Sequence, residues 1–266
     1  MSRTIVHNPR HYKYYDLVMA GFVTVLLCSN MIGPGKSCAI ELPFAIPFLG
    51  SLLVFGAGNL FFPISYIFGD ILTEVYGFAR ARKVIWAGFG AMIFYVVMSQ
   101  VVLNIPVNPE EKFNEVYQPA LEVVFGAGWR IVSASILAFW LGDFVNSYVL
   151  AKLKLLTNGR HLWTRTIGST LVGQGVDSMV FYPLGLADLR PILSALGVTD
   201  PAWLNAFNGW EYETVVKTVL LNWTIKVGVE IVMTPATYAI VGFLKRAENE
   251  DYFDRQTDFT PFSLKD

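Results

Sequence analysis

Charged residues are scarce in this sequence: Asp, Glu, Lys and Arg make up 15% of its 266 residues, against about 25% in soluble domains. It has only two cysteines, Cys28 and Cys38, and three histidines. Two cysteines are too few for a disulfide framework, and we expect both to be unpaired. No metal-site spacing and no phosphate-binding GxxxxGK[ST] loop occurs. The sequence therefore predicts a protein with no metal, no cofactor and no nucleotide hydrolysis of its own.

What the chain has instead is long apolar runs. Six of them have few charges, at roughly 15–33, 50–72, 84–104, 130–151, 165–186 and 217–244. A stretch of about 18 or more such residues is typical of a membrane-spanning helix. The first run lacks a small-residue cleavage pattern, so we interpret it as a retained helix. The sequence predicts an all-α integral membrane protein, a single domain over 1–266 with six transmembrane helices.

The charges that remain are distributed unevenly. Most Lys and Arg residues fall in four segments: 1–16, 73–83, 152–164 and 245–266. The alternate segments hold only three: Lys36, Lys112 and Arg190. The positive-inside rule places the basic segments and both termini on the cytoplasmic side of the membrane. We therefore expect a multi-pass protein of the bacterial cell (inner) membrane. Topology alone explains the basic segments, so no nucleic-acid partner is expected.

Three segments outside the runs have a recognisable character. The outer segment 34–49 is rich in proline, which predicts an irregular loop. The outer segment 187–216 has the length of a lid, but we favour an interfacial helix with a tryptophan anchor. The tail, 246–266, is polar and is expected to be loosely held.

Ten polar side chains lie within the runs or at their edges. They are the ionisable Asp70, Glu74, Asp143, Asp177, Lys226 and Glu230 and the neutral Asn30, Asn146, Gln174 and Asn222. An ionisable group at the bilayer centre costs at least about 2.5–3.5 kcal/mol, so each needs a reason. Spacings of three or four residues place most of them on narrow faces of four helices. We expect these faces to share one interior.

The number of carboxylates relative to lysines in the predicted interior indicates which kind of ligand it could bind. Five carboxylates accompany one lysine, and low dielectric forbids that all five are ionised and unpaired. Glu74 and Asp70 can reach the basic cluster after the second run, and Lys226 can pair with Glu230. Asp143 and Asp177 are left most in need of a donor-rich, cationic ligand. The alternative, that polar residues only hold helices together, is favoured for Asn30 and Asn222 taken singly.

Two further patterns bear on this interior. Gly142–Asn146 and Gly173–Asp177 both read G-[D/Q]-x-V-[N/D], which indicates paired roles of the fourth and fifth runs in one site. Aromatic residues of the last three runs, such as Trp140 and Phe144, offer a stacking surface for a flat ring. Pro63 is expected to kink the second helix beside Asp70 and Glu74, which marks a gate. We predict that Asp70, Pro63 and Glu230 are gate or helix-interface residues.

Several stretches resemble one known family. FFPISYIFGDILTEVYGFARARKVI, residues 61–85, resembles the hallmark segment of the queuosine precursor transporter family, also described as vitamin uptake proteins. Ser135–Asn146, STLVGQGVDS at Ser169–Ser178, and Lys226 with TPATY at Thr234–Tyr238 are similar to it too. The resemblance covers roughly 15–245. It differs in the exchanged amide and acid at Asp143 and Asn146 and in the long segment 187–216.

The resemblance implies a fold and a substrate. Members have six transmembrane helices, similar to the substrate-binding subunits of energy-coupling-factor vitamin transporters, and take up 7-deazaguanine precursors of the tRNA nucleoside queuosine. Such a base, in its 7-cyano or 7-aminomethyl form, presents an N1–H and a 2-amino group that one carboxylate can accept together. We expect Asp177 on that edge and Lys226 on the carbonyl. The remaining substrate-binding candidates are Asn30, Glu74, Asp143, Asn146, Gln174 and Asn222.

Three classes of function remain. A stand-alone uptake transporter is favoured over a substrate-binding subunit that needs a separate ATPase, because the first run lacks the A-x-x-x-A spacing typical of docking. An intramembrane enzyme needs a nucleophile–base pair or metal ligands at membrane depth, and no histidine lies there. We therefore expect no catalytic residues.

Overall fold

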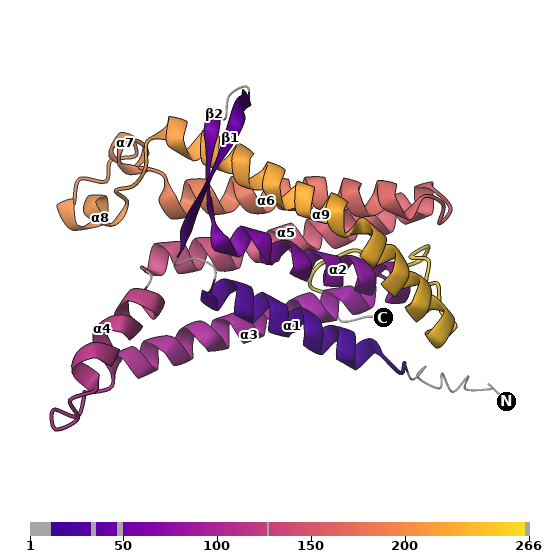
Figure 1. Ribbon diagram of the computed structural model, residues 1–266, viewed down its shortest axis with the longest axis horizontal. Helices are drawn as coiled ribbons and strands as arrows, with labels where there is room; N and C mark the ends of the chain where they lie inside the picture. The colour runs from indigo at the N-terminus through magenta and orange to yellow at the C-terminus, as the bar shows by residue number, and fades with distance from the viewer. Residues whose placement is uncertain (1–11, 33–35, 47–49, 127, 264–266) are drawn as a thin grey trace.

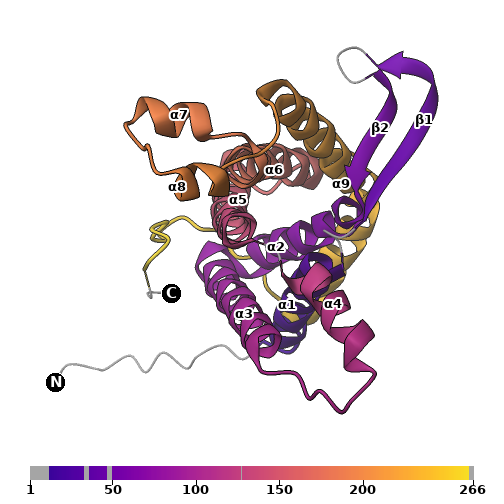
Figure 2. The same cartoon turned by 90° about the vertical axis from the view of Figure 1, so that its left-hand side faces the viewer.

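The computed structural model describes residues 12–32, 36–46, 50–126 and 128–263. Within them the chain forms a bundle of long helices from which a β-hairpin projects (Figure 1, Figure 2). The long helices are α1 (Tyr15–Ile32), α2 (Phe62–Tyr76), α3 (Phe78–Asn104), α5 (Trp129–Leu156), α6 (Leu162–Leu186) and α9 (Tyr212–Glu248). The short ones are α4 (Asn114–Phe125), α7 (Arg190–Ala195) and α8 (Pro201–Ala206).

Helix α2 lies in the middle of the bundle, as the end-on view of Figure 2 shows. It packs against α1, α3, α5 and α9. Its apolar residues Ile71, Leu72 and Val75 join a core with Phe22 and Leu26 of α1. Asp70 and Glu74 on the same helix are also fully buried. A helix enclosed on all sides must find protein partners for its polar groups, so α2 is the element around which a site forms.

Among the described residues, four helices are long and apolar enough to cross a membrane: α1, α3, α5 and α9. The prediction of a helical membrane protein is confirmed at this level. Each of the six predicted runs overlaps one long helix, but α2 has only 15 residues, and α6 is not apolar enough over 18 residues to count among these four. Helix α2 lies inside the bundle, whereas α6 packs against α5 and α9 and exposes one face, with Leu171 and Met179.

The predicted loop 34–49 and the start of the predicted run 50–72 are wrong, because they form an antiparallel hairpin. Strand β1 (Ser37–Ile46) pairs with β2 (Gly50–Gly56), and the register shifts after Glu41, close to Pro43. Proline has no N–H for the ladder and is tolerated at such irregularities. A short apolar run such as 50–56 has no periodicity that separates strand from helix. Residues 34, 35 and 47–49 of the predicted loop, and residue 33 of the first predicted run, lie outside the described residues.

The predicted kink at Pro63 is also wrong. Helix α2 begins at Phe62, after a 3-10 turn (Ala57–Leu60), so Pro63 occupies its first turn. Backbone N–H groups in the first turn of a helix have no intrahelical acceptor, so a proline there breaks no hydrogen bond and causes no kink. Pro63 therefore marks the start of α2, and the hydrophobic run before it belongs to the hairpin.

The repeated GDFVN and GQGVD stretches meet where α5 and α6 pack against each other. A Cβ on Gly173 would lie 2.6 Å from the Cβ of Asn146 and 3.0 Å from the carbonyl oxygen of Gly142. The two glycines therefore let the helix backbones approach. This crossing brings Asp143 and Asn146 of α5 alongside Gln174 and Asp177 of α6.

The predicted outer segment 187–216 folds onto the ends of α5 and α6. Arg130 of α5 donates to the carbonyl oxygens of Leu184 (2.7 Å), Asn208 (3.1 Å) and Ala187, and its guanidinium lies over Phe207. The segment contains α7 and α8, and Trp203 and Trp210 are exposed. Arg130 thus joins both sides of this connection to α5. Figure 1 shows the connection, with α7 and α8, at one end of the bundle.

The C-terminal tail is not loosely held over residues 249–263, which we call the strap. The Asp254 carboxylate accepts the backbone N–H of Phe78, the first residue of α3, at 3.0 Å. Arg82 donates to the carbonyl oxygens of Asp258 and Thr260, and Trp86 to that of Pro261. Burial raises the pKa of Asp254, while hydrogen bonds from Thr257 and the Phe78 amide act in the opposite direction. The strap ties the end of α9 to α3 and α5.

The strap shares its end of the bundle with the chain's other basic segments. The backbone N–H groups of Lys13 and Tyr14 donate to Glu248 at the end of α9. Lys154 of α5 contacts Asp251 at 2.6 Å. The predicted basic residues Arg3 and Arg10 lie outside the described residues. Cys28 and Cys38 are both free.

We predict that Gly173→Ala destabilises the protein by about 1–3 kcal/mol, because the added methyl group forces α5 and α6 apart. Thermal unfolding of the purified variant in detergent measures this loss. Gly90→Ala in α3 is the matched control, since a Cβ there has no atom within 4 Å. Equal unfolding temperatures for the two variants would show that the crossing is not tightly packed.

We predict that Asp254→Ala frees the start of α3, because the Phe78 N–H loses its acceptor. Loss of such a helix cap costs about 0.5–2 kcal/mol. Hydrogen exchange should become faster at residues 78–82 in Asp254→Ala and stay unchanged in Gln256→Ala, whose side chain is exposed. Unchanged exchange in both variants would contradict the capping role.

Candidate functional site

Four carboxylates and one lysine meet in the interior around α2. They are Asp70 of α2, Asp143 of α5, Asp177 of α6, and Glu230 and Lys226 of α9. None of these five residues is more than 5% exposed. The structure thus buries all of the predicted ionisable residues, and it separates them into groups with different partners.

Asp177 and Lys226 form a direct ion pair, with 2.5 Å between Oδ2 and Nζ. The ammonium group of Lys226 also lies over the ring of Phe62, 5.0 Å from its centroid. The predicted pairing of Lys226 with Glu230 along α9 is wrong, because the lysine reaches across to α6. The single lysine of the interior is therefore engaged with one carboxylate.

Asp143 and Gln174 are buried beside this pair without partners of their own. Neither oxygen of Asp143 and neither amide atom of Gln174 has a hydrogen-bond partner among the described residues. A buried polar group left unpaired costs roughly 1–3 kcal/mol. These two side chains are therefore the strongest indication of a ligand-binding site in the bundle.

Tyr66 is a site residue that the sequence did not reveal. It is fully buried on α2, and its hydroxyl lies within electrostatic reach of Asp177, Asp143 and Asp70. The hydroxyl has no hydrogen-bond partner among the described residues. Its spacing from Asp70, four residues earlier on the same helix, was the available signal. Tyr66 and Phe62 give the site an aromatic wall.

Three aromatic residues of the last three predicted runs, Trp140, Phe144 and Trp223, have their contacts elsewhere. Trp140 and Phe144 of α5 pack with Trp86 of α3 and with Phe262 of the strap. Trp223 donates its indole N–H to the carbonyl oxygen of Leu171. The expectation of stacking from the last three runs therefore does not hold for these residues.

Asp70 and Glu230 form another part of the interior. The Asn146 amide donates to Oδ1 of Asp70 at 2.6 Å. Oδ2 of Asp70 and both oxygens of Glu230 have no hydrogen-bond partner among the described residues. Glu230 is a like-charge neighbour of Asp70. The arrangement places two buried carboxylates together without a bonded cation.

The two remaining amides are bound to other groups. Asn222 is buried and accepts a hydrogen bond from Asn59, just before α2. Asn30 is only partly buried, donates to the carbonyl oxygen of Leu26 in its own helix, and accepts from Ser135. Neither has a hydrogen bond to the carboxylates among the described residues.

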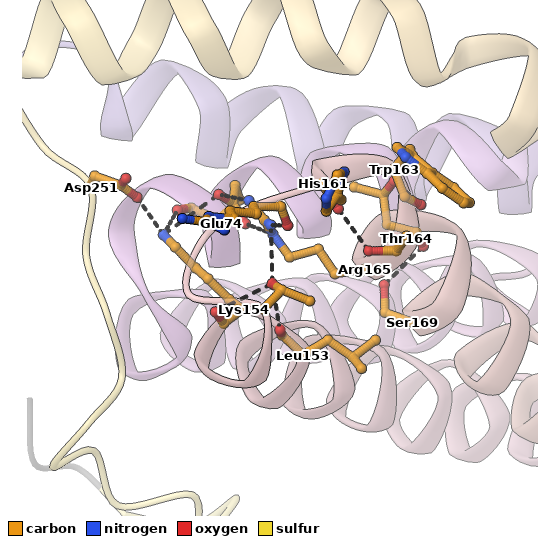
Figure 3. Close-up of polar contacts among 12 residues, drawn as sticks. Glu74, Leu153, Lys154, His161, Trp163, Thr164, Arg165, Ser169 and Asp251 are labelled. Atoms are coloured by element: carbon orange, nitrogen blue, oxygen red, sulfur yellow. Dashed lines mark hydrogen bonds and ion pairs between the residues drawn. The ribbon is translucent and has the colours of Figure 1, made fainter.

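Glu74 belongs to a separate ion cluster at the strap end of α2 (Figure 3). Arg165 of α6 holds both of its oxygens, at 2.7 and 2.8 Å, and Lys245 of α9 contacts Oε1 at 2.5 Å. Lys154 adds a contact at 3.6 Å and bridges to Asp251 of the strap. The predicted pairing with the cluster that follows α2 is wrong. Arg80 and Arg82 donate to carbonyl oxygens instead.

The interior therefore combines an excess of acceptors with enclosure. Four carboxylates and one ammonium group cannot all be ionised together at low dielectric without further partners. A donor-rich ligand, bound protons, or both balance this charge. An open depression lies elsewhere, between the start of α5 and α8, and is lined by Trp129, Ala202, Trp203 and Ala206.

Comparison with known proteins bears on the use of this interior. Residues 56–240 match the family model described as "Putative vitamin uptake transporter". The matched region contains every candidate site residue except Asn30. The chain is 28% identical over 183 residues to a "Probable queuosine precursor transporter" of Bacillus subtilis (strain 168), covering 68% of this chain and 69% of the relative. No solved structure matches the chain.

We predict that Arg165→Met lowers the free energy of unfolding by about 3–5 kcal/mol, because it leaves the buried Glu74 short of its main partner. Arg190→Met is the control, since Arg190 holds Asp188 with the same two-bond geometry but is 43% exposed. The control should lose less than about 1 kcal/mol. Similar small losses in both variants, measured by thermal unfolding, would contradict a supporting role of this cluster.

Proposed function

Since the chain belongs to the vitamin uptake transporter family, we propose that it imports queuosine precursors, 7-deazaguanine bases such as the 7-cyano and 7-aminomethyl forms. The observation that carries this proposal is the buried set of unpartnered acceptors and amides around Asp143 and Gln174. A guanine-like base offers the donors that such a set lacks.

We assign the base to the space between α2, α5, α6 and α9. Asp177 accepts the N1–H and 2-amino groups, and Lys226 turns from Asp177 to the base carbonyl. Asp143, Asn146 and Gln174 complete the set of hydrogen-bond partners. Tyr66 and Phe62 face the ring. The aminomethyl form is cationic, which offsets the excess negative charge of the interior.

In this proposal the protein is a multi-pass transporter of the cell (inner) membrane and not an enzyme. Both termini are cytoplasmic, and α2 and α6 join the four more apolar helices as spans, in the manner of the energy-coupling-factor binding subunits. The cluster around Glu74 then lies at the cytoplasmic end. Because the carboxylates are enclosed, loading a substrate requires α2 to separate from its neighbours, and Glu74 with Arg165 and Lys245 stands where an inner gate opens.

We predict that Asp177→Asn and Lys226→Met each reduce uptake of labelled 7-aminomethyl-7-deazaguanine by about 10-fold or more. A hydrogen bond to a charged group is worth about 1.5–3 kcal/mol, and 1.4 kcal/mol is tenfold. The assay uses the purified protein alone in liposomes. Lys217→Met is the control, because this lysine is on the same helix but is 58% exposed.

Parental uptake in both variants would contradict the site assignment. Binding of the base without transport would instead favour the alternative, a substrate-binding subunit that needs a separate ATPase. No binding by the parental protein would refute the proposed substrate class.

A further inference from the structure

Asp70 and Glu230 are two buried acids with no cation bonded to them among the described residues, unlike Glu74 and Asp177. Both are fully buried, on α2 and α9, which pack against each other. Three of their four carboxylate oxygens have no hydrogen-bond partner among the described residues. The fourth, Oδ1 of Asp70, accepts only a neutral donor, the Asn146 amide.

The cations nearest to the pair are engaged with other carboxylates. Lys226 is one turn from Glu230 on α9, but its ammonium group is on Asp177. Glu74, one turn from Asp70 on α2, is held by Arg165 and Lys245. From α5 the pair faces Asp143, another carboxylate, and so gains no positive charge.

Two adjacent buried carboxylates without a counterion cannot both be ionised at neutral pH. We propose that Asp70 and Glu230 together bind one exchangeable proton, and that this proton couples import to the transmembrane proton gradient. The site is distinct from the Asp177–Lys226 pair, where the negative charge is balanced within the protein. The coupling rests on the proposed function, whereas the binding of the proton does not.

Asn146 provides the physical link between proton and substrate. Its amide nitrogen stabilises the ionised form of Asp70, and its oxygen has no hydrogen-bond partner among the described residues. When a substrate draws this amide toward itself, Asp70 loses its donor and holds a proton more tightly. By thermodynamic linkage the proton then tightens the binding of the substrate. The proton and the substrate therefore cross the membrane together and in the same direction.

The first test is independent of transport. Infrared spectra of the purified protein at neutral pH should contain the C=O stretching band of a protonated carboxyl group. Glu230→Gln and Asp70→Asn should each weaken this band, because the remaining carboxylate of the pair can then ionise. Glu213→Gln, on the exposed start of α9, should leave it unchanged. A parental spectrum without the band, or a band unchanged in both pair variants, would overturn the proposal.

The second test separates coupling from substrate binding in liposomes that hold the purified protein. Glu230→Gln and Asp70→Asn should lose accumulation driven by a proton gradient, yet keep exchange of labelled for unlabelled 7-aminomethyl-7-deazaguanine. Retained exchange also shows that the variants are folded. Asp177→Asn should lose both activities, and Lys217→Met should keep both.

Gradient-driven accumulation in both pair variants would overturn the proposal. Loss of exchange as well as accumulation would also overturn the coupling, because it would place the pair in the substrate site. If the parental protein moves no precursor, the proposed function fails, and the infrared comparison alone decides whether the pair binds a proton.

Discussion

The constraint on which this structure depends is that its buried carboxylates must be balanced without bulk water. Asp70 and Glu74, one turn apart on α2, meet it in opposite ways. Glu74 is surrounded by Arg165, Lys154 and Lys245, so this end of α2 is fixed by charge. Asp70 receives only an amide. Helix α2 is therefore anchored by charge at its C-terminal end, while its middle lies beside buried acids that lack hydrogen-bond partners.

The balance of the interior explains why its elements pack as they do. The close crossing at Gly142 and Gly173 brings acids and amides of α5 and α6 together. Lys226 of α9 forms an ion pair with Asp177 of α6, and Glu230 has no hydrogen-bond partner among the described residues. The strap and Arg130 hold the two ends of the bundle. Polar groups such as Glu74 and Arg130 near the ends of the bundle have hydrogen-bond partners, whereas Asp143, Gln174 and Glu230 in the middle have none among the described residues.

Hydropathy and spacing predicted the helical membrane character and the common interior, because both follow from local periodicity. They failed where the partner is distant in sequence. The strand at 50–56 depends on pairing with 37–46, and Glu74 depends on Arg165 and Lys245, about 90 and 170 residues away. Tyr66 was missed because a tyrosine in an apolar run is ordinarily a packing residue. The strap was missed because polar tails are ordinarily frayed.

In the proposed site Asp177 recognises the guanidine edge of a flat base, and the unpartnered Asp143 and Gln174 bind beside it. Equilibrium binding of 7-deazaguanine and 7-deazaadenine to the purified parental protein in detergent tests this recognition directly, because only the first base has that edge. We expect that 7-deazaguanine binds and that 7-deazaadenine does not compete with it. Equal affinity for the two bases, or binding of neither, would contradict it.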